Sequence, residues 1–114
     1  MTLPATATAV DLSAGLFQGF ASIDANEIDW YTFVAPRSGV HLIQTSTTTN
    51  PPDTVLGVYD SAGNRRAYSD DYAPPDRDSR VDVSLTQGVR YYFGITNYIN
   101  TGQGAYEYLL RAPK

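Results

Sequence analysis

Aspartates are concentrated in one stretch of the chain, from residue 53 to residue 82. These thirty positions hold seven of the twelve acidic residues: Asp53, Asp60, Asp70, Asp71, Asp76, Asp78 and Asp82. Crowded carboxylates repel one another unless a cation or an arginine offsets their charge. Ca²⁺ takes about six to eight oxygen ligands in irregular geometry, and loop carboxylates and backbone carbonyls supply them readily. With one histidine and no cysteine, the chain offers little to a softer metal.

The elements around these aspartates predict how the carboxylates come together. Residues 54–59 and 65–69 have the pattern of two short strands, joined by a turn in which Gly63 is free to take positive φ. Antiparallel pairing about Ala62 predicts three opposed pairs: Tyr59 with Arg65, Leu56 with Tyr68, and Asp53 with Asp71. Like charges directly opposite in a sheet destabilise it. We therefore predict a calcium site at this end of the hairpin, with five candidate ligands: Asp53, Asp70, Asp71, Asp76 and Asp78.

Ion pairing is the alternative use of the same carboxylates. Arg77 and Arg80 lie inside the acidic segment and can pair with its aspartates, and an acidic loop can also be solvated. The spacing does not fit an EF-hand, because Arg80 follows Asp76 and Asp78 where a further ligand is required. Calcium binding and arginine pairing both remain open at this stage. A second acidic group, which more commonly would cap turns, supplies the secondary metal candidates: Asp24, Glu27 and Asp29.

The rest of the chain also has the pattern of strands. Apolar and polar residues alternate at short, even intervals, whereas no long window keeps helical spacing. About eight strands are predicted: 15–23, 29–35, 40–48, 54–59, 65–69, 81–85, 89–96 and 105–112. This number in 114 residues, without a helix, indicates an all-β fold, a single antiparallel β-sandwich resembling a jelly roll. Residues 1–12 are expected to form a lead-in segment, 13–112 the domain and 113–114 a tail.

Aromatic side chains are the second candidate for a binding surface. The chain holds nine tyrosines, four phenylalanines and one tryptophan. Alternation that buries Tyr31 turns Trp30 outward, and alternation that buries Phe93 turns Tyr92 outward. The candidate ligand-binding residues are Trp30, Tyr68, Tyr72, Tyr92 and Tyr98. Exposed rings stack on sugars or hold a protein ligand, but tyrosines can also simply cover the faces of a sheet.

Catalytic templates find little support in the chain. His41, the only histidine, lies inside a predicted strand, whereas a Ser-His-Asp set requires a histidine between a nucleophile and a carboxylate. We expect it to be a surface or half-buried residue. Gly102-Gln103-Gly104 is not a phosphate loop, because no lysine and no helix follow it. The acids lie in one turn-rich segment and not across a cleft, which argues against glycoside cleavage. We predict that the chain is not an enzyme.

Composition limits the partners of the chain. The formal net charge of −4 and the sequence pI of about 4.6 would repel nucleic acid, and no basic stripe offsets this. No apolar run approaches the length of a membrane span. The absence of cysteine removes disulfides and thiolate chemistry. Residues 1–16 lack the basic start and apolar centre of a signal peptide, so any export signal is expected outside this chain.

The order of several motifs resembles that of the bacterial pre-peptidase C-terminal domain. The resemblance runs from residue 5 to residue 112, which is nearly the whole chain. It is carried by Asp29-Trp30-Tyr31-Thr32-Phe33, Gly39-Val40, Asp53-Thr54-Val55-Leu56, Val58-Tyr59-Asp60, Gly63-Asn64, Asp70-Asp71, Asp78-Ser79-Arg80, Gly88 followed by Tyr91-Tyr92, and Gly104-Ala105-Tyr106-Glu107-Tyr108. No single motif is diagnostic, and the specificity lies in their order and spacing.

This resemblance implies a non-catalytic accessory module that is secreted or on the cell surface, attached to an exported enzyme or a surface protein. Some relatives, the collagen-binding domains of clostridial collagenases, bind calcium and collagen; others are proposed to assist secretion, substrate binding or stability. The expected partners are the parent's catalytic domain and an extracellular polymer, either a polysaccharide or a fibrous protein. The chain departs from the family pattern at Met1-Thr2-Leu3-Pro4, where relatives often carry acidic calcium ligands. Asp24, Glu27 and Asp29 would be the surviving part of that site.

Overall fold

The computed structural model of the chain describes residues 6–23, 28–46, 54–69, 79–97 and 104–114. Its strands form where buried and exposed residues alternate, as in 80–85, where every second side chain is buried. The elements are β1 (Thr8–Ala9), β2 (Leu16–Ile23), β3 (Ile28–Val34), β4 (Gly39–Ser46), β5 (Thr54–Asp60), β6 (Arg65–Ser69), β7 (Arg80–Leu85), β8 (Arg90–Asn97) and β9 (Gly104–Arg111). Within the described ranges, no helix has the length and hydropathy needed to cross a membrane.

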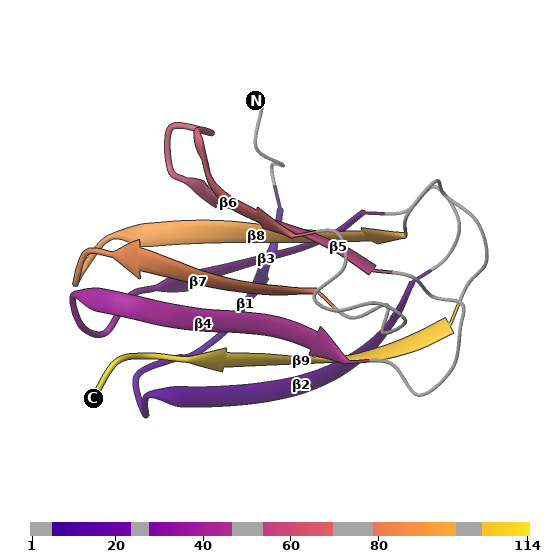
Figure 1. Cartoon of the computed structure of the whole chain (residues 1–114), viewed down its shortest axis with the longest axis horizontal. Helices are drawn as coiled ribbons and strands as arrows, with labels where there is room; N and C mark the ends of the chain where they lie inside the picture. Colours follow the sequence, from indigo (N-terminus) through magenta and orange to yellow (C-terminus); the bar gives the residue numbers. More distant parts are fainter. Residues whose placement is uncertain (1–5, 24–27, 47–53, 70–78, 98–103) are drawn as a thin grey trace.

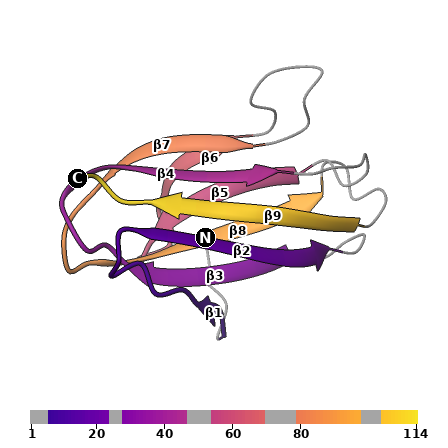
Figure 2. The same cartoon turned by 90° about the horizontal axis from the view of Figure 1, so that it is seen from below.

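Two sheets pack face to face as a sandwich. The five-stranded sheet has the order β1-β3-β8-β5-β6, and the four-stranded sheet has the order β2-β9-β4-β7. Figure 1 shows them as two layers, and Figure 2 shows the same layers from below. All pairings are antiparallel except that of β1 with β3. The predicted antiparallel β-sandwich is therefore confirmed, with nine strands in the described residues instead of about eight.

The additional strand lies in the stretch expected as a lead-in segment. β1 pairs with β3, and the backbone N–H of Val10 donates to the carbonyl of Thr32 at 2.8 Å. Val10 and Leu12 are buried in the core. A two-residue strand gives too short an alternation to be recognised in a sequence. The pattern of residues 1–12 therefore did not predict that this stretch adds a strand and two core residues.

The core between the sheets is rich in aromatic rings. Tyr31, Phe33, Tyr91 and Phe93 are all buried, which confirms the inward direction expected for Tyr31 and Phe93. The ring centroids of Tyr31 and Phe93 are 4.8 Å apart at an interplanar angle of 14°, an arrangement close to stacking. From the opposite sheet, Tyr108 packs its ring against Tyr31 at 4.6 Å. Because side chains alternate along a strand, the residues between these buried rings on β3 and β8 face outward.

The hairpin of β5 and β6 forms as predicted but with a different register. Tyr59 pairs with Arg65 as expected. A bulge between Val58 and Tyr59 then shifts the ladder by one residue, so Leu56 pairs with Ser69, and the predicted pairing of Leu56 with Tyr68 is wrong. The physical reason is an additional residue on the β6 side, which a count along the sequence does not reveal. The predicted pairing of Asp53 with Asp71 lies outside the described residues.

Eight strand ends lie together at one end of the sandwich. Register pairs Ile23 with Gly104, Ile28 with Thr96, and Thr54 with Asn97. The arrowheads of β2, β4 and β8 accordingly point to the same end in Figure 2. The strand ends that flank residues 24–27, 47–53, 70–78 and 98–103 therefore share one end of the molecule.

Candidate functional site

Most of the predicted metal ligands lie outside the described residues: Asp24, Glu27, Asp53, Asp70, Asp71, Asp76 and Asp78. Within the part of the chain that the structure describes, no group of three His, Cys, Asp or Glu side chains could hold a metal ion. Asp29 is the one predicted ligand that is described, and Arg80, one of the two arginines considered as partners for the acids, lies 3.5 Å from Asp82. Whether the remaining acids bind calcium or pair with Arg77 stays a prediction.

Asp29 takes part in a hydrogen-bonded chain between the two sheets. The hydroxyl of Tyr106 on β9 donates to Asp29 Oδ2 at 2.6 Å. Because that hydroxyl has one hydrogen, the 2.5 Å contact between the two phenol oxygens is a bond from Tyr31 to Tyr106. Burial raises the pKa of Tyr31 to about 12, against the opposing effect of its bond with Tyr106. Burial, and next the bond to Asp29, also raise the pKa of Tyr106 well above its ordinary value.

A cluster of buried hydroxyls joins three strand ends and is called here the hydroxyl cluster: Thr45, Thr54 and Ser79. The Oγ1 atoms of Thr45 and Thr54 are 2.6 Å apart, which links β4 in one sheet to β5 in the other. Ser79 donates from its hydroxyl to the carbonyl of Thr54 at 2.6 Å, and from its backbone N–H to Thr45 Oγ1 at 3.0 Å. All three side chains are buried. The cluster therefore joins the end of β4, the start of β5 and the residue that precedes β7.

The second candidate surface is the outward side of the five-stranded sheet. Trp30 and Tyr92 both lie there as predicted, because their neighbours along β3 and β8 face the core. Tyr59 pairs with Tyr92 across β5 and β8, and its ring centroid is 5.5 Å from that of Trp30. Tyr68 lies on the neighbouring strand β6 and is 52% exposed. These four residues, Trp30, Tyr59, Tyr68 and Tyr92, are called the outer aromatic face.

Of the other predicted aromatics, Tyr68 is described and Tyr72 and Tyr98 are not. The guanidinium of Arg65 lies 4.9 Å from the ring centroid of Tyr68, a cation–π contact that holds this exposed ring. The described part of the predicted set is therefore Trp30, Tyr68 and Tyr92, which the fold brings to one sheet surface.

Three residues of this surface were missed by sequence reasoning: Gly57, Tyr59 and Gly94. Trp30, Gly94, Gly57 and Tyr68 form one row across β3, β8, β5 and β6. The signal in the sequence was a glycine inside each of two strand patterns, which marks a place where another group approaches the backbone closely. The identity of the approaching group required the register between strands that are far apart in the chain.

His41 is buried, with 1% of its surface exposed, so the expectation of a surface or half-buried residue is wrong. It lies on the inward side of β4, where Val83 is its partner in the ladder. Its Nδ1 is 3.0 Å from the carbonyl oxygen of Gly39, and its Nε2 has no hydrogen-bond partner among the described residues. A histidine shielded in this way cannot reach a substrate.

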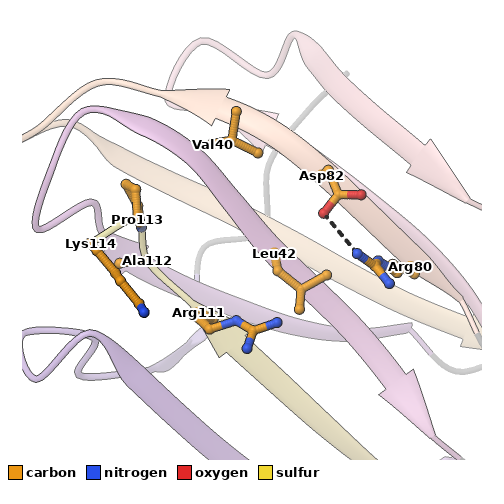
Figure 3. A pocket seen from close by; sticks show the side chains of 8 residues that line it. All are labelled: Val40, Leu42, Arg80, Asp82, Arg111, Ala112, Pro113 and Lys114. Atoms are coloured by element: carbon orange, nitrogen blue, oxygen red, sulfur yellow. Dashed lines mark hydrogen bonds and ion pairs between the residues drawn. The ribbon is translucent and has the colours of Figure 1, made fainter.

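The outward side of the four-stranded sheet carries a shallow groove of about 300 Å³. Figure 3 shows Val40 and Leu42 on β4, with Arg111 on one side and Arg80 with Asp82 on the other. Ala112, Pro113 and Lys114 complete its lining. Arg80 and Asp82 form an ion pair at 3.5 Å, and such half-exposed pairs contribute little to stability. The groove faces away from the outer aromatic face.

The strand order defines the β-sandwich found in bacterial pre-peptidase C-terminal domains, so the expected resemblance is confirmed as a likeness of fold. Such a domain from the collagenase of Bacillus anthracis superposes with a TM-score of 0.75 at 18% sequence identity, over 97% of this chain and 100% of that one. No family model matches the chain, and no curated protein matches it in sequence.

Two other solved structures share the fold. CorA, a surface-associated copper-binding protein of Methylomicrobium album BG8, has a TM-score of 0.71 at 8% identity, over 95% of this chain and 98% of that one. PliG, a periplasmic inhibitor of g-type lysozyme from Aeromonas hydrophila, has a TM-score of 0.68 at 14% identity, over 93% and 95%. At these identities the likeness is one of architecture, and function must be argued from surfaces.

Proposed function

We propose that the chain is a non-catalytic accessory domain of a larger exported or surface protein, and that it binds an extracellular polymer through the outer aromatic face. The observation that carries this proposal is the packing of Trp30 and Tyr59 on the outward side of the five-stranded sheet, 5.5 Å apart, with Tyr92 beside them. Large aromatic side chains on a sheet surface contribute binding area with little loss of conformational freedom.

Two further observations support this assignment. The single histidine is enclosed in the core, where its Nδ1 contacts the carbonyl oxygen of Gly39, and this burial fits a non-catalytic role. The three structures of similar fold named above come from a collagenase, a periplasmic inhibitor and a surface-associated protein. Export is part of the proposal, because one of these proteins is periplasmic and another is surface-associated.

Retention on insoluble polymers tests the proposal. The protein is mixed with chitin, cellulose and fibrous collagen, and the bound fraction is measured after sedimentation. Trp30→Ala and Tyr92→Ala are expected to lose retention on whichever polymer binds the unsubstituted chain. Phe20→Ala is the matched control, because Phe20 is 76% exposed on the other sheet. No retention on any of the three supports, or equal loss in the control, would overturn the assignment.

A bound calcium ion is a second component of the proposal. Its support is the arrangement of the described strand ends: Thr45, Thr54 and Ser79 are hydrogen-bonded to one another. The candidate ligands Asp53 and Asp78 directly precede Thr54 and Ser79 in the sequence. Calcium would stabilise the folded form by mass action, since it binds only where the ligands are held together.

A further inference from the structure

Two glycines on neighbouring strands serve as the floor of the outer aromatic face. Gly94 on β8 pairs with Gly57 on β5, in the centre of the sheet. A Cβ atom on Gly94 would lie 3.1, 3.2 and 3.3 Å from Cζ3, Cη2 and Cε3 of Trp30. Three consecutive ring atoms at nearly equal distances mean that the indole lies with its face on the backbone, since an edge-on ring would give unequal distances. Tyr59 covers Gly57 in a similar way: a Cβ atom on Gly57 would lie 2.7 Å from the Oη of Tyr59 and 3.1 Å from two of its ring carbons.

The glycines determine how the rings are presented. A side chain at either position would push away the ring above it, so glycine here lets the rings of Trp30 and Tyr59 lie close against the backbone. Both residues are partly exposed, and the ring faces turned away from the backbone are available to a ligand. The two ring planes meet at 52°, so together they form a bent platform and not a flat one.

A hollow of about 460 Å³ adjoins Trp30 on the side of β1. It is lined by Thr6, Ala7, Thr8, Ile28 and Trp30. This volume lies within the range of about 300–1,000 Å³ that is usual for small-ligand sites. Its described lining residues combine an aromatic ring with two threonine hydroxyls, which both donate and accept hydrogen bonds, and none of these five residues is charged.

This combination matches the chemistry of an uncharged sugar ring. A pyranose has a face of C–H groups that stacks on an aromatic ring and a rim of hydroxyls that needs donors and acceptors. Resting on the proposed function, we infer that the polymer is a neutral glycan, stacked on Trp30 and Tyr59 with one sugar residue in the hollow beside Thr6 and Thr8. The 52° angle between the two ring planes suits a glycan chain whose successive sugar rings are twisted relative to one another.

A fibrous protein is the competing partner, and the surface fits it less well. A specific protein interface buries about 800 Å² on each partner around a broad apolar centre. On β3 the exposed aliphatic residues, Ile28 and Val34, lie at opposite ends of the strand with Thr32 between Trp30 and Val34. They therefore flank the rings and do not extend them into one apolar area.

Tryptophan fluorescence tests the inference, because Trp30 is the only tryptophan in the chain. The protein is titrated with soluble mixed-linkage β-glucan, dextrin, chitin oligosaccharides, alginate and gelatin. A saturable change is expected with at least one neutral glycan and not with anionic alginate or gelatin. The same glycan should retard the protein in affinity electrophoresis, and soluble chains should compete with any retention on solid supports.

Variants separate this inference from the proposed function. Gly94→Ala keeps every ring but forces the indole to move by a few tenths of an ångström, and we expect roughly tenfold weaker glycan binding, or about 1.4 kcal/mol. Tyr59→Ala should abolish binding and Phe20→Ala should leave it unchanged, with thermal melts showing that each variant is folded. Binding of gelatin alone through Trp30 would overturn the inference that the polymer is a neutral glycan, and it would leave the proposed function standing. Preference for alginate, or glycan binding unaffected in Gly94→Ala and Tyr59→Ala, would also overturn it.

Discussion

At the scale of single residues, the Asp29 carboxylate, a candidate metal ligand, already accepts a hydrogen bond within the fold. Its Oδ2 accepts a 2.6 Å bond from Tyr106, which in turn accepts one from Tyr31. A bond to a charged acceptor is worth about 1.5–3 kcal/mol in a protein, more than one between neutral groups. The chain of bonds joins β3 to β9 and therefore one sheet to the other. Its first role is to hold the sandwich together.

Removing the central hydroxyl of this chain should destabilise the fold. Tyr106→Phe keeps the ring, but Asp29 loses this donor and the Tyr31 hydroxyl loses this acceptor. We expect the free energy of unfolding to fall by about 1–3 kcal/mol, the usual cost of removing one partner from buried hydrogen bonds. Urea denaturation measures the difference, and Tyr92→Phe on the outer aromatic face is the control. Equal stability of Tyr106→Phe and the parent would show that the bonds are not formed in solution.

The phenols also predict a loss of stability in alkali. Burial raises the pKa of Tyr31 from 10.0 to about 12, so the folded state holds this proton more tightly than the unfolded chain does. The resulting stabilisation is complete below pH 10 and is lost as the pH rises from 10 toward 12. Urea midpoints measured across this interval should fall, and they should fall less in Tyr31→Phe when each protein is compared with its own value at neutral pH. Tyr68→Phe, an exposed control, should follow the parent.

At the scale of elements, the hydroxyl cluster holds strand ends from both sheets in place. Thr45 is the last buried residue of β4, Thr54 begins β5, and Ser79 directly precedes β7. Side-chain hydroxyls are needed here because the ladders stop and backbone groups at the strand ends require other partners. Two of them are satisfied here: the Thr54 carbonyl accepts from the Ser79 hydroxyl, and the Ser79 N–H donates to Thr45 Oγ1.

Ser79→Ala should therefore weaken the junction of β4, β5 and β7. The substitution removes the hydroxyl that donates to the Thr54 carbonyl at 2.6 Å in a fully buried position. We expect a loss of about 1–3 kcal/mol in the free energy of unfolding. Ser84→Ala, on the exposed side of the strand that Ser79 precedes, is the matched control and should change stability by no more than about 0.5 kcal/mol. Equal effects of the two substitutions would show that the cluster contributes nothing.

The elements also show what a sequence can and cannot predict. Strands such as 81–85 were predictable because alternation is local, and the same parity turned Trp30 and Tyr92 outward. The order of strands in each sheet and the burial of His41 depend on contacts between distant segments. The bulge beside Tyr59 lies within a local hairpin, but a count along the sequence does not reveal it. The candidate site divides in the same way. Its rings were found from strand parity, whereas the paired glycines beneath them follow only from the register of β8 with β5.

At the scale of the whole molecule, charge is distributed unevenly along the chain. The segments 24–27, 47–53, 70–78 and 98–103 contain seven acidic residues: Asp24, Glu27, Asp53, Asp70, Asp71, Asp76 and Asp78. They contain one basic residue, Arg77. The strand ends that flank these segments meet at one end of the sandwich. This arrangement is what motivates calcium as a stabilising ion of the whole fold.

Calcium should raise the melting temperature if the ion is bound as proposed. At a concentration one hundred times its Kd, a ligand that binds only the folded form stabilises it by about 2.7 kcal/mol. For a domain of this size each kcal/mol corresponds to roughly 4 °C, so saturation should raise the midpoint by about 10 °C, reversibly on chelation. Mg²⁺ should act more weakly, because it demands stricter geometry. Asp71→Ala should abolish the shift, whereas Asp11→Asn, before the start of β2, should retain it. A midpoint indifferent to calcium would leave arginine pairing and solvation as the roles of these acids.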